Sequence, residues 1–498
     1  MDKNIELSTL SQEEVRIQKT KELLKIGVDP FGAKFERTSN SLEIKNKYAE
    51  DSKEILETKN VIVRIAGRIM SLRNQGKTAF LHLQDKFGTI QVYLRKDVLS
   101  EKEWEAFNLV DIGDIIGIEG IVMRTNHGEL TVKAQKYFHL SKALRPLPEK
   151  FHGLQDKEKA RRMRYVDLIM NEESKTIALK RPKVIRAFQE FFDSRGFVEV
   201  ETPILQPILG GANARPFVTH HNALDMPFYL RIATELPLKK LIVGGLEAVY
   251  EIGRLFRNEG MDATHNPEFT TVEAYLAYSD MEGMMELVED CFEAIALKVN
   301  GSTIVHADGN EINLKKGFKR IHMVDAIKEK TKIDFFKVKS DEEAIKLANK
   351  HKIPLQKHEM TFGHIVNLFF EKYVEETLIQ PTFVYGHPLD ISPLAKKNKK
   401  DPRFTDRFEL FINKHEYANA FSELNDPIDQ KERFLKQLEE KASGNEEATE
   451  MDTDFIEALE YGLPPTGGLG IGIDRTVMLL LEVDTIRDVL LFPHMRNK

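Results

Sequence analysis

The sequence contains one cysteine and no long apolar segment. The first shortage argues against disulfide-stabilised and cysteine-zinc proteins, and the second argues against membrane-spanning proteins. A lone Cys291 cannot form an intrachain disulfide or a cysteine-rich zinc site, and the zinc-protease motif HExxH is also absent. Apolar runs such as Val477–Leu481 are far shorter than a membrane-spanning helix requires. The first residues lack the apolar core of a signal peptide. We therefore expect a cytoplasmic protein without a membrane segment.

Several nucleotide-binding and catalytic motifs are missing as well. No segment carries the phosphate-binding loop GxxxxGK[ST], the nucleophile motif GxSxG or the protein-kinase motifs. The glycine-rich segment Gly467–Arg475 has the wrong spacing for a dinucleotide fingerprint, and too few residues follow it to complete a βαβ unit. Its glycines would instead permit close packing, and an arginine at the end of such a strand can cover an adenine face and reach a phosphate.

The composition is that of an ordinary globular chain with two or three domains. The 498 residues are 41% hydrophobic and 30% charged, with 72 basic against 79 acidic side chains and a net charge of −7. A net charge of −7 argues against a surface that is positive throughout, but it is compatible with a local basic groove that binds nucleic acid.

Residues 60–145 show the alternation of apolar residues that is typical of short β-strands. Val61, Val63 and Ile65 alternate, and the segments TAFLHLQD, TIQVYLR, DIIGIEGIVMRT and GELTVKAQKYFHL follow, with a helical stretch near residues 100–109. Five strands with a helix after the third predict an OB-fold barrel. Such barrels bind single-stranded nucleic acid on the face of their second and third strands, and a barrel without a ligand is the alternative.

An aromatic ring for stacking and polar groups for base edges occur where that face is expected. Phe80 and Gln91 belong to the second and third strands, Arg73 lies in the loop before them, and Glu129 lies at the start of the segment predicted as the fifth strand. We predict that these four residues contact nucleic acid.

Polar segments flank the predicted barrel. Residues 1–59 have apolar residues at roughly helical spacing, which indicates a helical arm that is either solvated or in contact with RNA. Residues 146–175 form a linker, and the stretch 142–164 around its start has more basic than acidic residues. Either a solvated surface or a hinge that follows RNA phosphates explains this charge.

Residues 176–498 are predicted to form one large domain of helices and strands. Valine, isoleucine and phenylalanine residues at spacings of three and four indicate a helix that ends at Gly196. The following segment FVEVETPIL is a strand that Pro203 breaks, which places it at a sheet edge. Residues of about 302–378 are helix-rich and carry no polar cluster, so we expect them to form an insertion.

The stretch Tyr250–Tyr275 carries the strongest chemical signal. It is predicted as two strands joined by a charged loop, so alternate side chains share a face. Arg257 and Glu259 continue one face of the first strand, and Phe269 and Glu273 share a face of the second. An aromatic ring stacks on a flat base, an arginine binds a phosphate, and carboxylates hold a metal ion or an amine.

A second hairpin, at residues 408–423, repeats this arrangement with a turn near Asn413. Glu409 lies on its first strand and Glu416 follows the turn, and two carboxylates beside a phosphate site suggest Mg²⁺. The same alternation places three further residues on one face: Asn419, Phe421 and Glu423.

Three segments resemble the three motifs of class II aminoacyl-tRNA synthetases: Gly196–Pro203 resembles motif 1, Glu251–Tyr275 motif 2 and Gly467–Arg475 motif 3. Seven strings in order are similar to the lysyl members of this class: FHGLQDKEKARRMRYVDLI, GGANARPF, RIATELPLK, FRNEG, HNPEF, HPLDISPLAK and AFSELNDP. The resemblance implies an α+β chain in which a five-stranded OB-fold anticodon-binding domain precedes a catalytic domain built on an antiparallel sheet flanked by helices. It also implies a homodimer, because motif 1 packs across a two-fold axis in this family.

The resemblance further implies an enzyme that joins L-lysine to ATP and transfers lysine to the 3′ end of tRNA(Lys), with Mg²⁺ as cofactor. Arg257 and Arg475 would be the catalytic residues. The implied ATP contacts are Arg257, Glu259, His265, Asn266, Phe269, Glu409, Gly472 and Arg475. The implied lysine contacts are Gly211, Glu235, Glu273, Tyr275, Asn419, Phe421 and Glu423, while Glu409 and Glu416 would bind Mg²⁺. The four barrel residues would contact the anticodon.

Three alternatives make different demands on these residues. The sister enzymes for aspartate and asparagine share the organisation, but their pockets need cationic or amide groups, whereas the pocket expected here is acidic. A lysyl transferase that modifies a translation factor resembles the catalytic half alone. An inactive scaffold would not need the four charged residues Arg257, Glu409, Glu416 and Arg475. One departure from the family pattern is Thr264, which stands where some members have a basic residue, so a phosphate contact is lost or moved.

Overall fold

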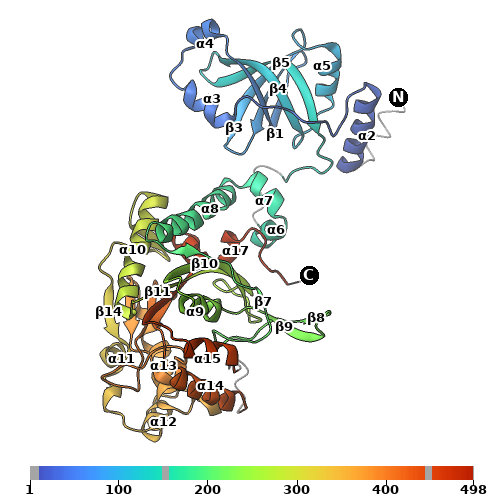
Figure 1. Ribbon diagram of the computed structural model, residues 1–498. Coiled ribbons are helices and arrows are strands. Elements are labelled where there is room, and N and C mark those ends of the chain that lie inside the picture. The colour runs from blue at the N-terminus through green and yellow to red at the C-terminus, as the bar shows by residue number, and fades with distance from the viewer. Residues whose placement is uncertain (1–10, 149–155, 443–450, 497–498) are drawn as a thin grey trace. The chain divides into compact units, whose positions relative to one another are not determined.

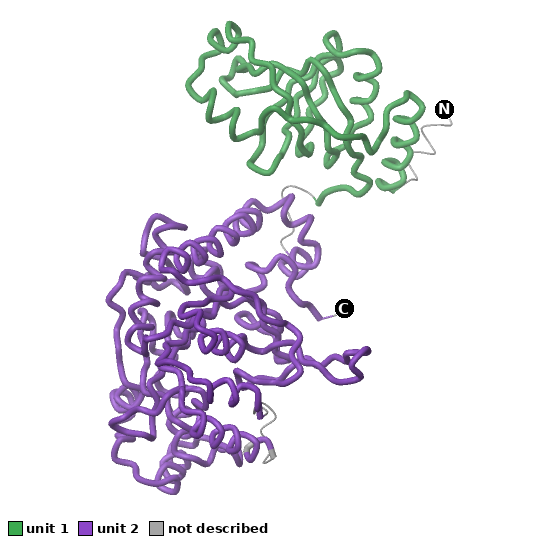
Figure 2. Tube along the Cα trace, in the orientation of Figure 1, with its two compact units in different colours: residues 1–153 green, residues 154–498 purple. Residues whose placement is uncertain are grey.

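The computed structural model describes residues 11–148, 156–442 and 451–496 and consists of two compact units (Figures 1 and 2). Unit 1 comprises residues 1–153 and unit 2 residues 154–498. The predicted arm and linker therefore fall partly outside the described residues, at 1–10 and 149–155, and residues 443–450 and 497–498 also lie outside them. Within the described ranges no helix is long and apolar enough to cross a membrane.

A closed five-stranded barrel forms the centre of unit 1, with the strand order β1-β2-β3-β5-β4. Alternate side chains such as Leu81 and Val92 point into the barrel and are buried. Neighbouring strands are antiparallel except for β3 and β5. The predicted OB-fold organisation, with a helix after the third strand, is confirmed. The elements are β1 (Ile62–Asn74), β2 (Thr78–Gln84), β3 (Thr89–Arg95), α5 (Glu101–Asn108), β4 (Ile115–Arg124) and β5 (Leu130–Ser141).

Three helices precede the barrel, and they pack against it. Leu23, Ile44 and Leu56, one from each helix, are fully buried in the same apolar core as the barrel strands. The expectation of a solvated arm is therefore wrong for the described part, because these apolar residues cover the barrel. The helices are α2 (Gln12–Lys25), α3 (Ser41–Lys47) and α4 (Lys53–Lys59), and each begins after a serine or asparagine that caps its first N–H groups.

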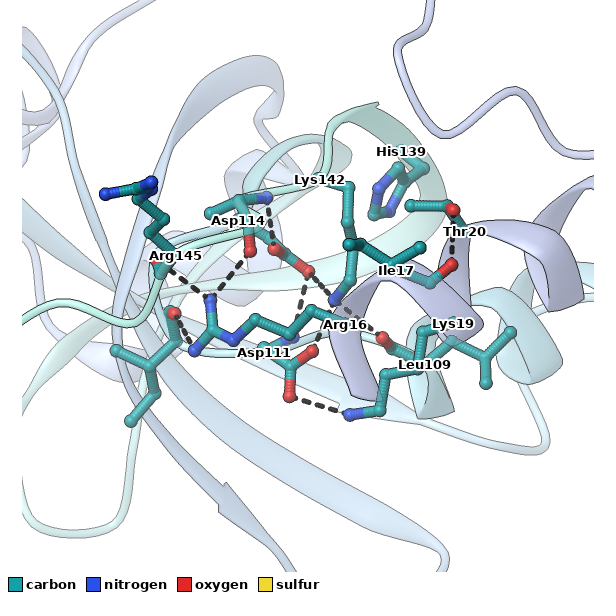
Figure 3. A network of polar contacts seen from close by, with 12 residues as sticks. Arg16, Ile17, Lys19, Thr20, Leu109, Asp111, Asp114, His139, Lys142 and Arg145 are labelled. Carbon is teal, nitrogen blue, oxygen red and sulfur yellow. Dashed lines mark hydrogen bonds and ion pairs between the residues drawn. The ribbon is translucent and has the colours of Figure 1, made fainter. Parts of the chain in front are cut away.

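A buried polar network ties α2 and the chain after β5 to the barrel (Figure 3). The Arg16 guanidinium donates a hydrogen bond to the carbonyl oxygen of Ala143 at 2.8 Å. The Lys142 ammonium, whose side chain is fully buried, pairs with Asp111 at 2.5 Å and with Asp114 at 2.7 Å. Because Asp114 is also fully buried, each charge depends on the other for its stability.

Replacing Lys142 with Met should destabilise unit 1 by about 3 kcal/mol, because Asp114 would remain buried without its cation. Hydrogen exchange of β4 and β5 in the full-length protein measures this change. The matched variant Lys136→Met removes an exposed pair with Glu119 and should change the opening free energy by less than about 1 kcal/mol. Equal protection in the two variants would contradict the role assigned to Lys142.

An eight-stranded sheet, with the order β14-β15-β16-β17-β18-β11-β10-β6, forms the centre of unit 2. The expected antiparallel sheet is confirmed from β15 to β10, but each edge strand pairs in parallel, so the sheet is mixed. The predicted edge position of the strand after Gly196 is confirmed by β6. The strands are β6 (Val198–Glu199), β10 (Ala248–Phe256), β11 (Glu268–Ala277), β14 (Lys319–His322), β15 (Thr382–Tyr385), β16 (Arg407–Ile412), β17 (His415–Ser422) and β18 (Thr466–Gly472).

The two faces of this sheet differ because neighbouring residues of a strand point to opposite sides. Tyr250 and Val272 belong to the large core, which they share with α8 (Glu172–Asp193) and α10 (Met281–Asn300). These two helices lie side by side (Figure 1). Val249 and Tyr275 point to the other face and pack in a smaller core with α9 (Glu235–Val243). The second face is the one that carries the candidate site.

The segment 302–378 is helix-rich, as predicted, but it is not purely helical. It contains the hairpin β12 (Ile304–Ala307) and β13 (Asn310–Asn313), and β14 joins the main sheet. Its helices are α11 (Met323–Thr331), α12 (Asp341–Lys350) and α13 (Phe362–Tyr373), with 3₁₀ turns at Phe335–Lys337, Lys357–Glu359 and Glu375–Thr377.

The predicted linker is helical and packed in its described part. Arg164 pairs with Asp167 at 2.6 Å and donates to the carbonyl oxygen of Leu491 at 3.0 Å. The remaining elements of unit 2 are α6 (Lys157–Arg162), α7 (Arg164–Met170), β7 (Leu205–Gln206), β8 (Val218–His221), β9 (Met226–Leu230), the 3₁₀ turn Leu389–Ile391, α14 (Pro427–Ala442), α15 (Thr453–Glu460), α16 (Ile473–Leu480) and α17 (Ile486–Val489).

Candidate active site

A cavity of about 350 Å³ opens on the second face of the sheet, and residues of β11, β17 and β18 line it. The strand β18 carries glycine at alternate positions. Tyr275 and Phe421 flank Gly468 from the two neighbouring strands, and Glu273 flanks Gly470. Because β18 has only glycines on this face of the sheet where it lines the cavity, the side chains of the two neighbouring strands enclose an open space above it. The expected glycine-rich strand that runs into a helix is confirmed by β18 and α16.

One glycine of this floor has no space for a side chain. A methyl group at Gly468 would overlap the Glu423 carboxylate and come within 2.7 Å of Tyr275 Cε1. At Gly470 the nearest atom, Glu273 Cγ, would lie 3.8 Å away. The bare backbone at Gly468 is therefore what lets Glu423 and Tyr275 approach the floor.

One end of the cavity is built to receive an anion and a flat ring. The Arg257 guanidinium lies 5.2 Å from the Phe269 ring centroid, and its Nε is buried without a hydrogen-bond partner among the described residues. Arg475, in the first turn of α16, donates to the Glu416 carbonyl oxygen at 2.6 Å, and its other nitrogen lies 3.1 Å from His265 Nε2. A stacking face and cationic groups thus converge on one volume.

The loop between β10 and β11 is held by its own turn. Asp262 accepts hydrogen bonds from the backbone N–H groups of Thr264 and His265, each at 2.7 Å, and pairs with the His265 ring at 2.8 Å. Burial alone would raise the pKa of Asp262, but these hydrogen bonds outweigh burial and lower the pKa to about 2. Thr264, the position that departs from the family pattern, is therefore part of the turn that orients His265.

The other end of the cavity is acidic. Glu235 and Glu273 both line it, together with Tyr275, whose hydroxyl donates to Glu273 at 3.3 Å. Burial and the nearby Glu235 raise the pKa of Glu273 to about 7, although the Thr234 N–H donates to it at 3.2 Å. Carboxylates placed close together in a low-dielectric site are stabilised by a cationic ligand.

Sequence reasoning missed Lys239, a buried cation at this acidic end. Its ammonium lies 2.5 Å from Glu235 Oε1 and contacts Glu423 Oε2. The side chains of Lys239 and Glu423 are both fully buried, and Glu423 does not line the cavity itself. The spacing of four residues between Glu235 and Lys239 on one helix was a usable signal for this pair.

A second cavity, of about 490 Å³, shares Arg257 and Glu416 with the first and is also lined by Glu409. Burial and the neighbouring Glu409 raise the pKa of Glu416 to about 7, so the two carboxylates lie close enough to interact. Arg407, which sequence reasoning also missed, pairs with Glu409 at 2.5 Å and donates to Asn419 at 2.9 Å.

The carboxylates Glu409 and Glu416 fit a divalent cation that takes its other ligands from phosphate and water. Within the described ranges no group of three or more His, Cys, Asp or Glu side chains could hold a metal ion by itself. The two donors would need further oxygen ligands, such as those of a nucleotide phosphate, to hold Mg²⁺, so the metal site stays a prediction for this pair.

The first cavity brings most of the predicted site residues together. Its lining includes Gly211, Glu235, Arg257, Glu259, His265, Asn266, Phe269, Glu273, Tyr275, Glu416, Asn419, Phe421, Gly472 and Arg475. Glu409 lines only the adjoining cavity, and Glu423 lines neither.

The four barrel residues form a separate surface on unit 1. The rings of Phe80 and Tyr93 stack with centroids 4.6 Å apart, and the Gln91 amide donates to Glu129 at 2.7 Å. Arg73 lies on β1 directly opposite Phe80, so its predicted position in a loop is wrong, because β1 continues to Asn74. Aromatic, amide and guanidinium groups are thus neighbours on this surface.

Comparison with known proteins agrees with this geometry. The family model "tRNA synthetases class II (D, K and N)" matches residues 156–496, and the model of the OB-fold nucleic acid binding domain matches residues 63–140. The chain belongs to the class II tRNA synthetases. Members of this family depend on ATP and generally use Mg²⁺.

Three curated relatives of this synthetase are similar over nearly their whole length. The lysine–tRNA ligase of Streptococcus sanguinis (strain SK36) is 59% identical over 485 residues, which cover 97% of this chain and 98% of the relative. The lysine–tRNA ligase of Listeria monocytogenes serovar 1/2a is 58% identical over 484 residues, 97% of each chain. That of Staphylococcus haemolyticus is 58% identical over 490 residues, 98% of this chain and 99% of the relative.

Replacing Gly468 with Ala should lower the free energy of unfolding by about 1–3 kcal/mol, because the methyl group displaces Glu423 and Tyr275. The matched variant Gly470→Ala has space for its methyl group and should change stability by less than about 1 kcal/mol. Denaturant unfolding of the two variants measures the difference. A Gly468→Ala protein as stable as Gly470→Ala would show that the floor of the cavity is not closely packed.

Proposed function

We propose that this synthetase activates L-lysine with ATP and transfers it to tRNA(Lys). The observation that carries the proposal is one cavity with carboxylates at one end and an arginine–phenylalanine pair at the other. An ammonium group that leaves water is stabilised only where acceptors such as Glu235 and Glu273 replace the water. The sister substrates of the family, aspartate and asparagine, would place an anion or an amide against these carboxylates.

In this proposal ATP occupies the end of the cavity near Arg257. Phe269 and Arg475 cover the two faces of the adenine ring, and Glu259 contacts its edge. His265 and Asn266 face the phosphates, and the absence of a side chain at Gly472 leaves room for the nucleotide.

Lysine then occupies the acidic end of the cavity. Gly211 and Glu235 take its α-amine, and Arg257 takes its carboxylate. Its side chain extends along the acidic pocket, which is lined by Glu273, Tyr275, Asn419 and Phe421, and Glu423 lies buried beside the floor at Gly468.

The chemistry needs no nucleophile from the protein. A carboxylate oxygen of lysine attacks the α-phosphorus in line, the bond to pyrophosphate breaks, and lysyl-adenylate forms. A hydroxyl of the terminal tRNA ribose then attacks the acyl carbon, and AMP leaves. Arg257 stabilises the charge that grows on the α-phosphate, and such a positioned donor contributes about 10²–10³ in rate.

Glu409 and Glu416 would hold Mg²⁺, which would supply positive charge to neutralise the departing pyrophosphate.

We further propose a homodimer that forms at motif 1. Val198, Ile204 and Leu205 are exposed apolar residues in and after the edge strand β6, and a second copy of the chain would cover them. A cytoplasmic location also stays a prediction.

Amino-acid-dependent ATP–pyrophosphate exchange, measured with each of the twenty amino acids, tests the specificity. We expect exchange with lysine and none above background with aspartate or asparagine. Exchange driven by aspartate or asparagine would contradict the proposed function.

Replacing Phe80 with Ala should lower kcat/KM for tRNA(Lys) about tenfold, because stacking of one base on an aromatic ring contributes about 1–3 kcal/mol. Aminoacylation with varied tRNA measures this loss, and lysine-dependent ATP–pyrophosphate exchange should stay unchanged. The exposed Phe31, which lies outside the barrel strands, provides the control variant Phe31→Ala. An equal loss in both assays would argue against a role for Phe80 in tRNA binding.

A further inference from the structure

Lys239 is a buried cation of the acidic pocket that the proposed reaction does not use. It lies one helical turn after Glu235 on α9, and its side chain is fully buried. Its ammonium bridges Glu235, at 2.5 Å, and Glu423. The rings of Phe421 and Phe455 lie 5.4 and 5.8 Å from the same ammonium and shield it from water.

The charges of this pocket are unequal without a ligand. The pocket holds three carboxylates, on Glu235, Glu273 and Glu423, and the ammonium of Lys239, which contacts the first and the third, so the fully ionised pocket would carry two surplus negative charges. L-Lysine brings two ammonium groups, and its carboxylate would meet Arg257. Binding of lysine therefore brings the buried charge to zero, and it does so only while Lys239 is present.

We propose that Lys239 is a positioning residue for lysine selection: by bridging Glu235 and Glu423, it holds both carboxylates aligned toward the two ammonium groups of the substrate. This inference rests on the proposed function. Lys239 acts through the two carboxylates and does not itself touch the reacting atoms.

The position of Glu423 supports this role. One of its oxygens contacts Lys239, and the other lies beside Gly468 on the floor of the cavity. Within the described part of the chain neither oxygen has a well-aligned hydrogen-bond donor, and both are buried. Without Lys239 this carboxylate would have no cation beside it, and it would take up a proton and lose its attraction for an ammonium group.

The titratable groups that face Glu423 are Lys239 and Glu235 from α9 and Glu273 and Tyr275 from β11. Burial raises the pKa of Glu423 well above its ordinary value; Lys239 opposes this rise, and Glu235 and Glu273 add to it. Burial alone would lower the pKa of Lys239, but Glu235 and Glu423 outweigh it and raise the pKa, so Lys239 stays charged. Removing Lys239 therefore moves the ionisation of Glu423 to higher pH.

ATP–pyrophosphate exchange of Lys239→Met, with varied lysine between pH 6 and pH 9, tests the proposal. We expect the KM for lysine to rise at least tenfold at pH 7, while the KM for ATP stays within twofold of the wild type. The defect should shrink as the pH rises, because Glu423 then ionises without its partner.

The control is Lys240→Met, the neighbouring lysine on α9. Lys240 pairs with the exposed Asp454, away from Glu235 and Glu423, so this variant should keep wild-type kinetics for both substrates. An unchanged KM for lysine in Lys239→Met, or a parallel loss for lysine and ATP at every pH, would overturn the proposal.

Lys239→Arg keeps the positive charge and decides the matter if Lys239→Met does not fold. We expect a severalfold higher KM for lysine, because the larger guanidinium changes the spacing of Glu235 and Glu423, with the same pH dependence as the wild type. A defect in this variant as large as that expected for loss of the charge, and one that shrinks as the pH rises, would overturn the proposal. Failure of the proposed function itself would be seen separately, as an absence of lysine-dependent exchange in the wild-type enzyme.

Discussion

A surplus of buried negative charge is the constraint on which the rest of this structure depends. Glu235, Glu273 and Glu423 come from three different parts of unit 2, and one ammonium, on Lys239, partly neutralises them. Carboxylates in such a site are unstable unless a cation joins them. In the proposed function the pocket selects its ligand by charge, and the end beside Arg257 and Phe269 would hold the nucleotide that reacts with this ligand.

The sheet creates this pocket through alternation. Odd-numbered residues of β11 and β17 point to the same face as the even-numbered glycines of β18, and the registers place Glu273 and Asn419 on either side of Gly470. Large side chains on β18 would fill the space that these residues enclose. The opposite face, with residues such as Tyr250, packs against α8 and α10 and keeps the floor in place. One face of these strands thus packs in the core, and the other face lines the cavity.

Features that depend on local periodicity could be predicted from the sequence. The barrel strands, the two hairpins and the glycine-rich strand follow from alternation and turn residues, and Asn413 and Lys414 indeed adopt the left-handed conformation of a tight turn. Features that depend on packing between distant segments could not be predicted from the sequence. Lys239 looks like a surface lysine until α9 is placed on the sheet, and Leu23 looks solvated until α2 meets the barrel. Similarly, Glu423 was expected in the wall of the cavity, but the packing of α9 pairs it with Lys239.

The most direct test of the account is the number of protons exchanged when lysine binds to the wild-type enzyme. Calorimetry at pH 7 in buffers of different ionisation enthalpy measures this number. Because burial and Glu235 raise the pKa of Glu273 to about 7, and the pKa of Glu423 is raised as well, we expect a net release of protons when lysine binds, and tighter binding as the pH rises through 7. Binding without proton release, or binding that weakens over this pH range, would contradict the claim that the pocket holds surplus buried carboxylates.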